Sequence, residues 1–378
     1  MKKTLGILLI ISAILITFAI LYTKYFDTSD KTATNSDSSV LNLQKENFVW
    51  GANTSCYQID GYVEETADKQ IEIINDLKIN TVRMFLERRI SLEPFEVIYD
   101  EKANDSFVEK LKENNKDIVM IVDGDIINSA TIDGFDQESA GYQMGKYAAS
   151  RYKGKIKYYQ IANEVTGTSI KPSDPSFTGP TFKGDYNVEY STERYRALLG
   201  WLKGMQKGIR ESDEQAKIVI SGHWHLYFII DKLIKDGIDP DVIGWAWYSD
   251  DGDDITERDL GEGKSFNLAA KLNEFGRDVW IIELNSTKGS YNESKKRNDE
   301  EYQSNFLKKM VPNLIETGLI KGILIYTLFD TPSFADGRDE SETHWGLVNV
   351  SKNKNGSVVF KTKKAFSTFR SLIEKYSN

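Results

Sequence analysis

The sequence has almost no cysteine, since Cys56 is the only one in 378 residues. A single thiol excludes an intrachain disulfide and a zinc cluster of the cysteine type. Histidine is nearly as rare, and a three-histidine metal site would use all 3 of them. An excess of positive charge is also missing, because the formal net charge is −9. An acidic chain suits a neutral substrate better than nucleic acid, which is not expected as a partner.

One long apolar run stands out near the N-terminus. Leu5 to Tyr22 carry no charge and follow Lys2 and Lys3. As a helix this run is about 27 Å long, enough to span a bilayer. The two lysines favour an N-terminus that stays in the cytoplasm. No small-x-small cleavage site follows, so residues 1–26 are predicted to be an uncleaved signal anchor.

The sequence after this run divides into a linker and a body. Residues 27–40 are polar and rich in Ser, Thr, Asp and Asn, and we predict a short flexible stalk. Residues 41–378 then form the folded domain, held at the cell membrane on its outer side. A cleaved signal peptide is the alternative and would release a secreted protein.

The body has the composition of a globular α/β domain and alternates short apolar runs with amphipathic stretches. Strands are predicted at 48–53, 81–86, 118–122, 156–162, 217–221, 242–248, 279–284 and 322–329. Helices are predicted near 66–77, 104–114, 139–152, 191–211, 227–236, 264–275, 299–317 and 361–376. This succession of strand–helix units favours a (β/α)₈ TIM barrel. An open doubly wound sheet would carry a glycine-rich phosphate turn, and Gly51 to Ser55 contain none.

Two glutamates stand where apolar strands end. Glu164 follows the fourth predicted strand and Glu283 ends the seventh. Barrel enzymes carry their chemistry at these strand ends, and strands four and seven face each other across the ring. Glycoside hydrolysis needs such a pair, about 5–5.5 Å apart for retention and further apart for inversion. Either glutamate alone could instead be a loop-edge carboxylate or the partner of a stabilising cation.

The neighbourhood of these glutamates resembles a known group. Asn163 directly precedes Glu164, and Trp345-Gly346-Leu347 follows the eighth strand. In these features the chain resembles clan A glycoside hydrolases, retaining (β/α)₈ enzymes, over most of 48–378. The resemblance implies Glu164 as the acid/base, Glu283 as the nucleophile and Asn163 as a ligand of the sugar 2-hydroxyl.

Two further residues match the same group. The resemblance implies that Arg83, inside an apolar strand, lies beside the nucleophile and that Tyr248 donates a hydrogen bond to it. Cellulases and mannanases of family five are similar, but this chain diverges from them. Val165 replaces the usual proline, Ala246 replaces a histidine, and the tryptophan that usually ends strand eight is absent.

Aromatic and polar residues near the strand ends suit a sugar, whose ring faces are apolar. We predict that each of the following contacts substrate: Trp50, Asn53, His223, Trp224, Trp247, Phe329 and Trp345. Any one aromatic residue could instead pack in the core. The loop after the sixth strand holds Asp250, Asp251, Asp253 and Asp254. It lacks the glycine and glutamate of an EF-hand, so a solvated acidic loop is expected rather than a calcium site.

The sequence thus predicts a monomeric retaining glycoside hydrolase that cleaves a β-linked polysaccharide of the β-1,4-glucan or mannan type, within the chain. No cofactor and no metal are expected. Transglycosylation would use the same residues. A non-catalytic carbohydrate-binding barrel would keep the aromatic residues but lose an acid or a base. A metal hydrolase on this fold would need histidines on the first strand, which has none.

Overall fold

The computed structural model describes most of the chain from Asn47 onward. Contacts divide the chain into two units, Met1–Asn47 and Phe48–Asn378. The predicted anchor (1–26) and stalk (27–40) lie outside the described residues and stay predictions. In the described part of the chain, no helix is long and apolar enough to cross a membrane. The described residues are 47–55, 60–86, 88–92, 95–122, 136–165, 192–224, 226–259, 265–292, 294–333 and 343–377.

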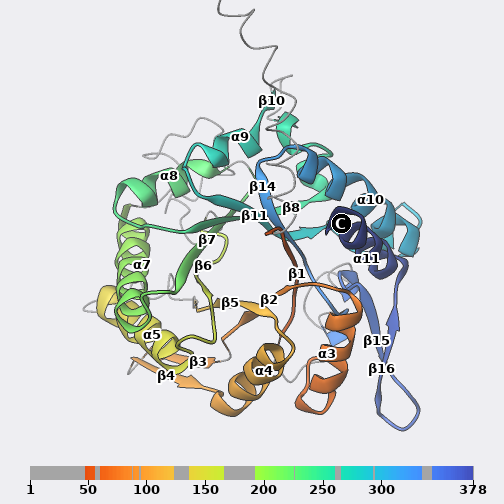
Figure 1. Cartoon of the computed structure of the whole chain (residues 1–378), viewed down its shortest axis with the longest axis horizontal. Coiled ribbons are helices and arrows are strands. Elements are labelled where there is room, and N and C mark those ends of the chain that lie inside the picture. Colours follow the sequence, from red (N-terminus) through yellow and green to blue (C-terminus); the bar gives the residue numbers. More distant parts are fainter. Residues whose placement is uncertain are drawn as a thin grey trace, which may run out of the picture. The chain divides into compact units, whose positions relative to one another are not determined.

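Parallel strands close into a barrel at the centre of the body (Figure 1). Around the ring they follow chain order, and the last strand, β14, pairs with the first, β1. This confirms the predicted (β/α)₈ fold, with strand ends shifted by a few residues. The strands are β1 (Val49–Asn53), β2 (Thr81–Phe85), β5 (Asp117–Ile121), β6 (Tyr158–Ala162), β7 (Lys217–His223), β8 (Val242–Tyr248), β11 (Asp278–Asn285) and β14 (Ile320–Ile325).

Helices form a ring outside the strands (Figure 1). They are α3 (Ala67–Asp76), α4 (Glu101–Glu113), α5 (Gln137–Arg151), α7 (Thr192–Ser212), α8 (Tyr227–Lys235), α9 (Leu268–Asn273), α10 (Glu300–Glu316) and α11 (Lys364–Ser377). The helix expected at 264–275 is shorter than predicted. Ser265–Phe266 form a strand, β10, that pairs with β9 (Arg258–Asp259), and Asn267 then caps α9 by accepting the N–H of Ala270.

Strand alternation sorts the side chains into an inner and an outer set. The outer set joins the large core between strands and helices. The inner set forms a separate apolar cluster of Val119, Tyr158, Val219, Val242, Trp280, Ile282 and Leu324. This cluster fills the barrel interior, so polar groups of the inner set gather above it, at the carboxyl ends of the strands.

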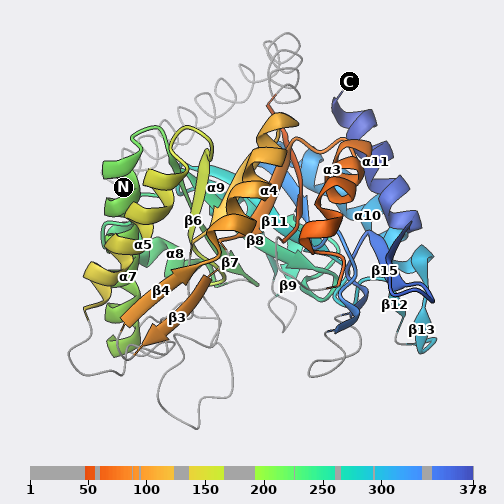
Figure 2. The ribbon, with the colours of Figure 1, turned by 90° about the horizontal axis from the view of Figure 1, so that it is seen from below.

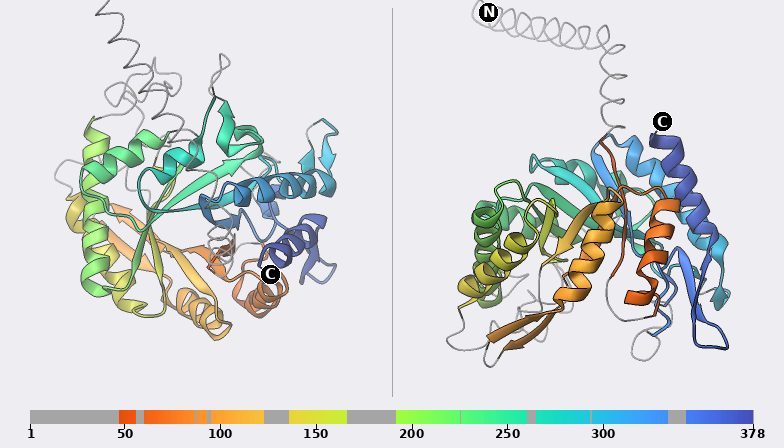
Figure 3. Two further views of the ribbon diagram at one scale, coloured as in Figure 1. Left: turned by 45° about the horizontal axis from the view of Figure 1, so that its top comes forward. Right: turned by 60° about the horizontal axis from the view of Figure 1, so that its bottom comes forward.

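Short two-stranded sheets interrupt the strand–helix alternation, and the sequence analysis predicted none of them. Besides β9–β10, they are β3 (Arg88–Leu92) with β4 (Phe95–Tyr99), β12 (Tyr291–Asn292) with β13 (Arg297–Asn298), and β15 (Val348–Lys352) with β16 (Val358–Thr362). The first two lie at the end of the barrel where the strands finish (Figure 2). The third lies along α11, as Figures 1 and 3 show.

Candidate active site

A pocket of about 310 Å³ opens at the carboxyl ends of the strands. That volume lies at the small end of the range for ligand sites. Seven predicted site residues line it: Asn163, Glu164, His223, Trp224, Tyr248, Glu283 and Trp345. The remaining lining residues were not predicted as site residues: Phe85, Asp250, Asp251, Thr287 and Tyr326. Both glutamates therefore face one pocket from different strands of the barrel.

Glu283 lies deep in this pocket, near the end of β11. A β-bulge between Ile281 and Glu283 changes the register of the strand and turns this side chain inward. Nη1 of Arg83 donates to its Oε1 at 2.8 Å, and the Tyr248 hydroxyl donates to its Oε2 at 2.9 Å. Both carboxylate oxygens thus have a donor, and one donor carries a permanent positive charge. These two contacts favour the ionised form of Glu283.

Arg83 is the centre of a buried polar cluster. Its side chain is 1% exposed, inside a strand whose neighbours are apolar. Besides Glu283, its Nε donates to Gln160 at 2.8 Å and its Nη2 to Oδ1 of Asn163 at 2.7 Å. A buried guanidinium is tolerated only when its donors are satisfied. The cluster therefore fixes the cation against Glu283.

Asn53 supports this cluster from β1 and does not line the pocket as predicted. It is buried, and its Oδ1 accepts a hydrogen bond from Nη1 of Arg83. Its Nδ2 donates to the carbonyl oxygens of Ile282 at 2.9 Å and Ile325 at 3.0 Å. The predicted substrate contact is therefore wrong. Asn53 ties its own strand β1 to β2, β11 and β14 around Arg83 and so positions the arginine.

Glu164 lies on the more open side of the pocket, two residues after β6. Its φ of 46° falls in the left-handed region, which is uncommon for a residue with a β-carbon. Its backbone N–H donates to the Ser221 hydroxyl at 2.9 Å, and its Oε1 lies 3.5 Å from Nδ1 of His223. Its side chain is 34% exposed, against 9% for Glu283. Glu164 can therefore meet both a leaving group and water.

The two carboxyls influence each other's protonation. Burial, together with the charge of Glu164, raises the pKa of Glu283 despite Arg83 and Tyr248. Burial acts in the same direction on Glu164, but a hydrogen bond from His223 and the charges of His223 and Arg83 outweigh it and lower the pKa of Glu164. Interacting carboxyls of this kind titrate as a pair that shares its first proton. The opposite shifts favour the uptake of the first proton by Glu283 over its uptake by Glu164.

Aromatic side chains form two walls of the pocket. The ring of Trp224 is stacked on that of His223, with centroids 4.7 Å apart, and is 43% exposed. The φ of Trp224 is 55°, which is strained for a bulky residue. Nε1 of Trp245 donates a hydrogen bond to the carbonyl oxygen of Trp224 at 3.1 Å. In the second wall, the ring of Trp345 meets Tyr326 edge to face at 5.2 Å. Both walls offer the apolar surface that a sugar face requires.

Three predicted aromatic contacts are wrong. Trp50 is 2% exposed, Trp247 and Phe329 are 0% exposed, and all three belong to the core between strands and helices. Trp50 packs against Phe369 of α11, and Phe329 stacks on Tyr62. Trp50 and Trp247 occupy outward positions of their strands, which face the helices and not the barrel axis.

The acidic loop after β8 is partly built into the site. Asp251 is buried, accepts the backbone N–H of Tyr248 at 2.9 Å and pairs with Arg258 at 3.1 Å. Burial raises the pKa of Asp251 to about 6. Asp250 lies at the pocket rim, where its Oδ1 accepts the Thr287 hydroxyl at 2.6 Å. The expectation of a wholly solvated loop is therefore wrong for these two residues.

The other two aspartates of the loop have separate partners. Asp253 pairs with Lys309, and Asp254 caps the short helical turn Ile255–Glu257 through the N–H of Thr256. The four carboxylates thus do not converge on one point. Across the part of the chain that the structure describes, no group of three or more His, Cys, Asp or Glu side chains is placed to hold a metal ion.

The contact between Tyr248 and Glu283 predicts a pH effect. Burial and the charge of Glu283 raise the pKa of Tyr248 well above its usual value, so it stays a donor. Tyr248→Phe removes a hydrogen bond that lowers the pKa of Glu283, so that pKa rises further. If ionised Glu283 is required, the acidic limb of the kcat/KM profile moves to higher pH. At neutral pH we expect a loss of roughly 10- to 100-fold, the worth of a hydrogen bond to a charged group.

A pH–rate profile of the variant beside the wild type measures this effect. Tyr326→Phe is the matched control, because it removes a hydroxyl from the same pocket and leaves the donor to Glu283 in place. An acidic limb at the same pH in wild type and Tyr248→Phe would contradict the prediction.

Comparison with known proteins places the chain by its fold. No family model and no curated protein matches the sequence. Among solved structures, a β-glucosidase from Thermotoga maritima in complex with deoxynojirimycin has a TM-score of 0.61 at 14% identity, covering 88% of this chain and 98% of that one. Native xylanase 10B from Thermotoga maritima has a TM-score of 0.59 at 16% identity, covering 89% and 98%.

Xylanase 10B from Thermotoga petrophila RKU-1 in complex with xylobiose is similar to the same extent, with a TM-score of 0.58 and 15% identity over 89% of this chain and 97% of that one. At such identities the likeness is one of fold. These neighbours are clan A glycoside hydrolases with the same closed barrel, so the resemblance noted in the sequence is confirmed at that level.

Proposed function

We propose that this protein is a retaining glycoside hydrolase with Glu283 as nucleophile and Glu164 as acid/base. The observation that carries the proposal is the pairing of two carboxyls in one pocket with unequal surroundings. Arg83 and Tyr248 occupy both oxygens of the buried Glu283, whereas Glu164 is more exposed beside His223. Unequal surroundings are what allow two carboxyls to take different roles in one reaction.

The reaction follows from this arrangement. An oxygen of Glu283 attacks the anomeric carbon while Glu164 transfers its proton to the leaving oxygen, so the glycosidic bond breaks as the ester bond forms. Glu164, now ionised, takes a proton from water, whose oxygen displaces Glu283 from the anomeric carbon. The ester bond to Glu283 breaks, the sugar leaves with its new anomeric hydroxyl in the original configuration, and Glu164 is protonated again.

The first step needs ionised Glu283 and protonated Glu164, whereas the pKa shifts of the two carboxyls by themselves favour the opposite order of protonation. The positive charge that develops at the anomeric carbon as the glycosidic bond weakens stabilises ionised Glu283 in the transition state. Arg83 and Tyr248 then stabilise the anion without rearranging, because both are already in place.

The pocket walls support a carbohydrate ligand. Trp224 and Trp345 offer ring faces, and Asn163 is held in the pocket by Arg83 and Gln160, where it can meet a sugar hydroxyl. We propose a β-linked polysaccharide of the β-1,4-glucan or mannan type, cut within the chain. His223 lies beside Glu164, on the side where the leaving group is protonated.

The location of the protein remains part of the proposal. The uncharged run from Leu5 to Tyr22 supports a membrane anchor, with the barrel outside the cell and residues 27–40 as the stalk. Such a place suits an enzyme acting on a cell-surface polymer. We propose that the barrel acts as a monomer, since the pocket is formed by strands of one chain.

The test is a substrate panel with product analysis. The full chain is incubated with aryl β-glycosides and with β-glucan, mannan and xylan, and the first product is examined by proton NMR. We expect the β-anomer first, and oligosaccharides rather than monosaccharide from a polymer. An α-anomer as first product would exclude retention, and monosaccharide alone would exclude endo action. Products longer than the substrate would identify a transglycosylase.

A further inference from the structure

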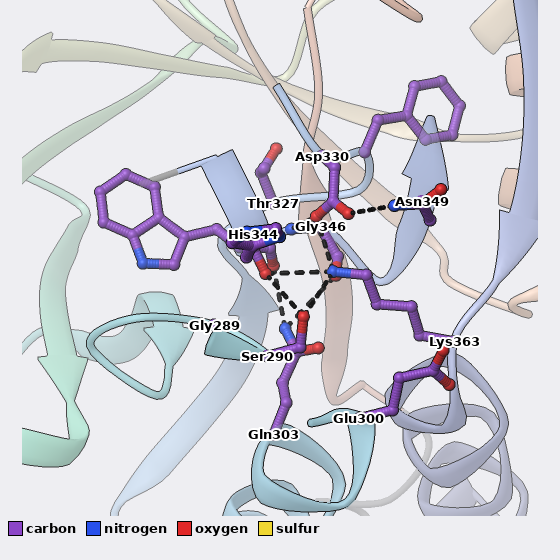
Figure 4. A network of polar contacts seen from close by, with 12 residues as sticks. Gly289, Ser290, Glu300, Gln303, Thr327, Asp330, His344, Gly346, Asn349 and Lys363 are labelled. Carbon is purple, nitrogen blue, oxygen red and sulfur yellow. Dashed lines mark hydrogen bonds and ion pairs between the residues drawn. The ribbon is translucent and has the colours of Figure 1, made fainter. Parts of the chain in front are cut away.

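A buried ion pair lies outside the catalytic contacts. Lys363, just before α11, and Asp330, after β14, are 2% and 1% exposed, and Nζ of the lysine lies 2.6 Å from Oδ1 of the aspartate (Figure 4). Burial lowers the pKa of Lys363 and raises that of Asp330, so each depends on the other's charge. A buried pair of this kind is seldom more stable than an apolar pair of similar volume. The role of this ion pair therefore depends on the other groups to which Lys363 and Asp330 are hydrogen-bonded.

Both partners hold the backbone around Trp345. Nζ of Lys363 donates to the carbonyl oxygen of His344 at 3.1 Å, and Oδ1 of Asp330 accepts the N–H of Gly346 at 2.8 Å. The residue between these two contacts is Trp345, whose ring lines the pocket. The ion pair thus fixes the chain on each side of a pocket residue without entering the pocket itself.

Further contacts fix Trp345 from the barrel side. Its carbonyl oxygen accepts hydrogen bonds from Nδ2 of Asn285 at 2.7 Å and Nε2 of Gln303 at 3.0 Å. Its indole Nε1 donates to the carbonyl oxygen of Thr287 at 2.8 Å. With both the backbone and the ring nitrogen held, the ring is confined to one orientation.

Close packing leaves the segment no room to shift. A β-carbon on Gly346 would lie 2.0 Å from the backbone nitrogen of Asp330, and one on Gly289 would lie 2.0 Å from the carbonyl oxygen of His344. Gly289 also has a φ of 56°, which favours glycine. The neighbouring Ser290 hydroxyl receives a hydrogen bond from Lys363 at 3.0 Å (Figure 4).

We propose that the Lys363–Asp330 pair is a positioning device that fixes residues 344–346 and thereby presents the ring of Trp345 to the pocket as a platform for a sugar ring. Neither residue is a catalytic group. The positioning follows from the contacts alone, whereas the identity of the ligand as a sugar rests on the proposed function.

The double variant Lys363→Met/Asp330→Leu tests this role, because it removes both charges and leaves neither partner unpaired. We expect a folded protein with a somewhat lower Tm, because the charges are removed together but the N–H of Gly346 and the hydroxyl of Ser290 each lose a partner. KM for an aryl β-glycoside should rise roughly three- to tenfold, the scale of one aromatic contact, while kcat stays within about a factor of two. Adding Trp345→Phe to the double variant should raise KM little further, because the two changes act on one contact.

A second readout does not depend on activity. The fluorescence of Trp345 is obtained as the difference between each protein and its Trp345→Phe counterpart, and acrylamide quenching reports the exposure of the ring. We expect stronger quenching in the double variant. Arg210→Met/Asp241→Leu is the control, because this pair lies at the amino ends of the strands and leaves Trp345 untouched. It should change neither KM nor quenching.

Two results would overturn the inference. One is a folded double variant with wild-type KM and wild-type quenching of Trp345. The other is an equal change in the Arg210/Asp241 control, which would show a general loss of stability. If the double variant does not fold, Lys363→Arg takes its place, because it keeps the positive charge but displaces the hydrogen bonds of Lys363. KM and the quenching of Trp345 in this variant then test the inference. If the wild type cleaves no glycoside, the proposed function fails, and quenching still decides the positioning.

Discussion

Glu283→Gln is expected to lower kcat on any cleaved glycoside by roughly 10⁴-fold or more, the scale on which loss of a covalent nucleophile acts. The amide retains the shape, its single oxygen can still accept from Arg83, and its NH2 group can donate to the Tyr248 hydroxyl oxygen, so the fold should survive. It cannot form the ester bond with the anomeric carbon. Far-UV circular dichroism and steady-state kinetics of the variant and the wild type measure the two effects separately.

A smaller side chain identifies the role of the residue as well as its importance. In Glu283→Ala, azide can occupy the vacated space and attack the sugar from the same face, which yields a glycosyl azide of inverted configuration. Asp250→Asn is the control, since Asp250 is a pocket carboxylate with no part in the mechanism. It should keep most of the activity. An azide product of retained configuration from Glu283→Ala would instead assign Glu283 as the acid/base and Glu164 as the nucleophile.

The barrel itself could be predicted from the sequence because its pattern repeats. Apolar runs and amphipathic helices alternate along the chain, so one misplaced boundary changes little. The sequence also predicts that Glu164 and Glu283 lie at strand ends, because each follows or ends an apolar run. The β9–β10 and β12–β13 hairpins have only two residues per strand, too few for a periodic signal.

Strict alternation along the strands accounts for the burial of Trp50 and Trp247. Gly51 and Asn53 of β1 point into the barrel, so Trp50 must point outward. In β8, Tyr248 faces the pocket and Trp247 therefore faces the helices. Sequence distance from a strand end was a poor guide, whereas parity along the strand would have placed both tryptophans correctly.

Alternation alone would not have placed Glu283 in the pocket. Trp280 and Ile282 both belong to the cluster inside the barrel, so a regular strand would turn Glu283 outward. The bulge adds one residue, and Glu283 pairs with inward-facing Ala246 of β8. No local residue pattern in β11 announces this bulge. The roles of Asn53 and Lys363 were hidden for a related reason, because their partners are remote in sequence.

Glu164→Gln is expected to produce a loss that depends on the leaving group. A sugar leaving group needs a proton, so kcat/KM for an oligosaccharide should fall roughly 10²- to 10⁴-fold, the usual contribution of general acid catalysis. A 2,4-dinitrophenyl glycoside needs no proton, and its first step should stay near the wild-type rate. The second step still needs a base to activate water, so the covalent intermediate accumulates.

Stopped-flow release of dinitrophenolate detects this as a burst of one equivalent per enzyme, followed by a slow phase. Added azide needs no base and should speed the slow phase, giving a glycosyl azide of retained configuration. His223→Gln serves as a matched variant, because it removes the neighbour at 3.5 Å and keeps the carboxyl. Because the hydrogen bond from His223 lowers the pKa of Glu164, this variant should move the basic limb of the pH profile to higher pH. It should show no burst. Equal losses on the two substrates in Glu164→Gln would remove this residue from the acid role and leave the proton donor to be found elsewhere in the pocket.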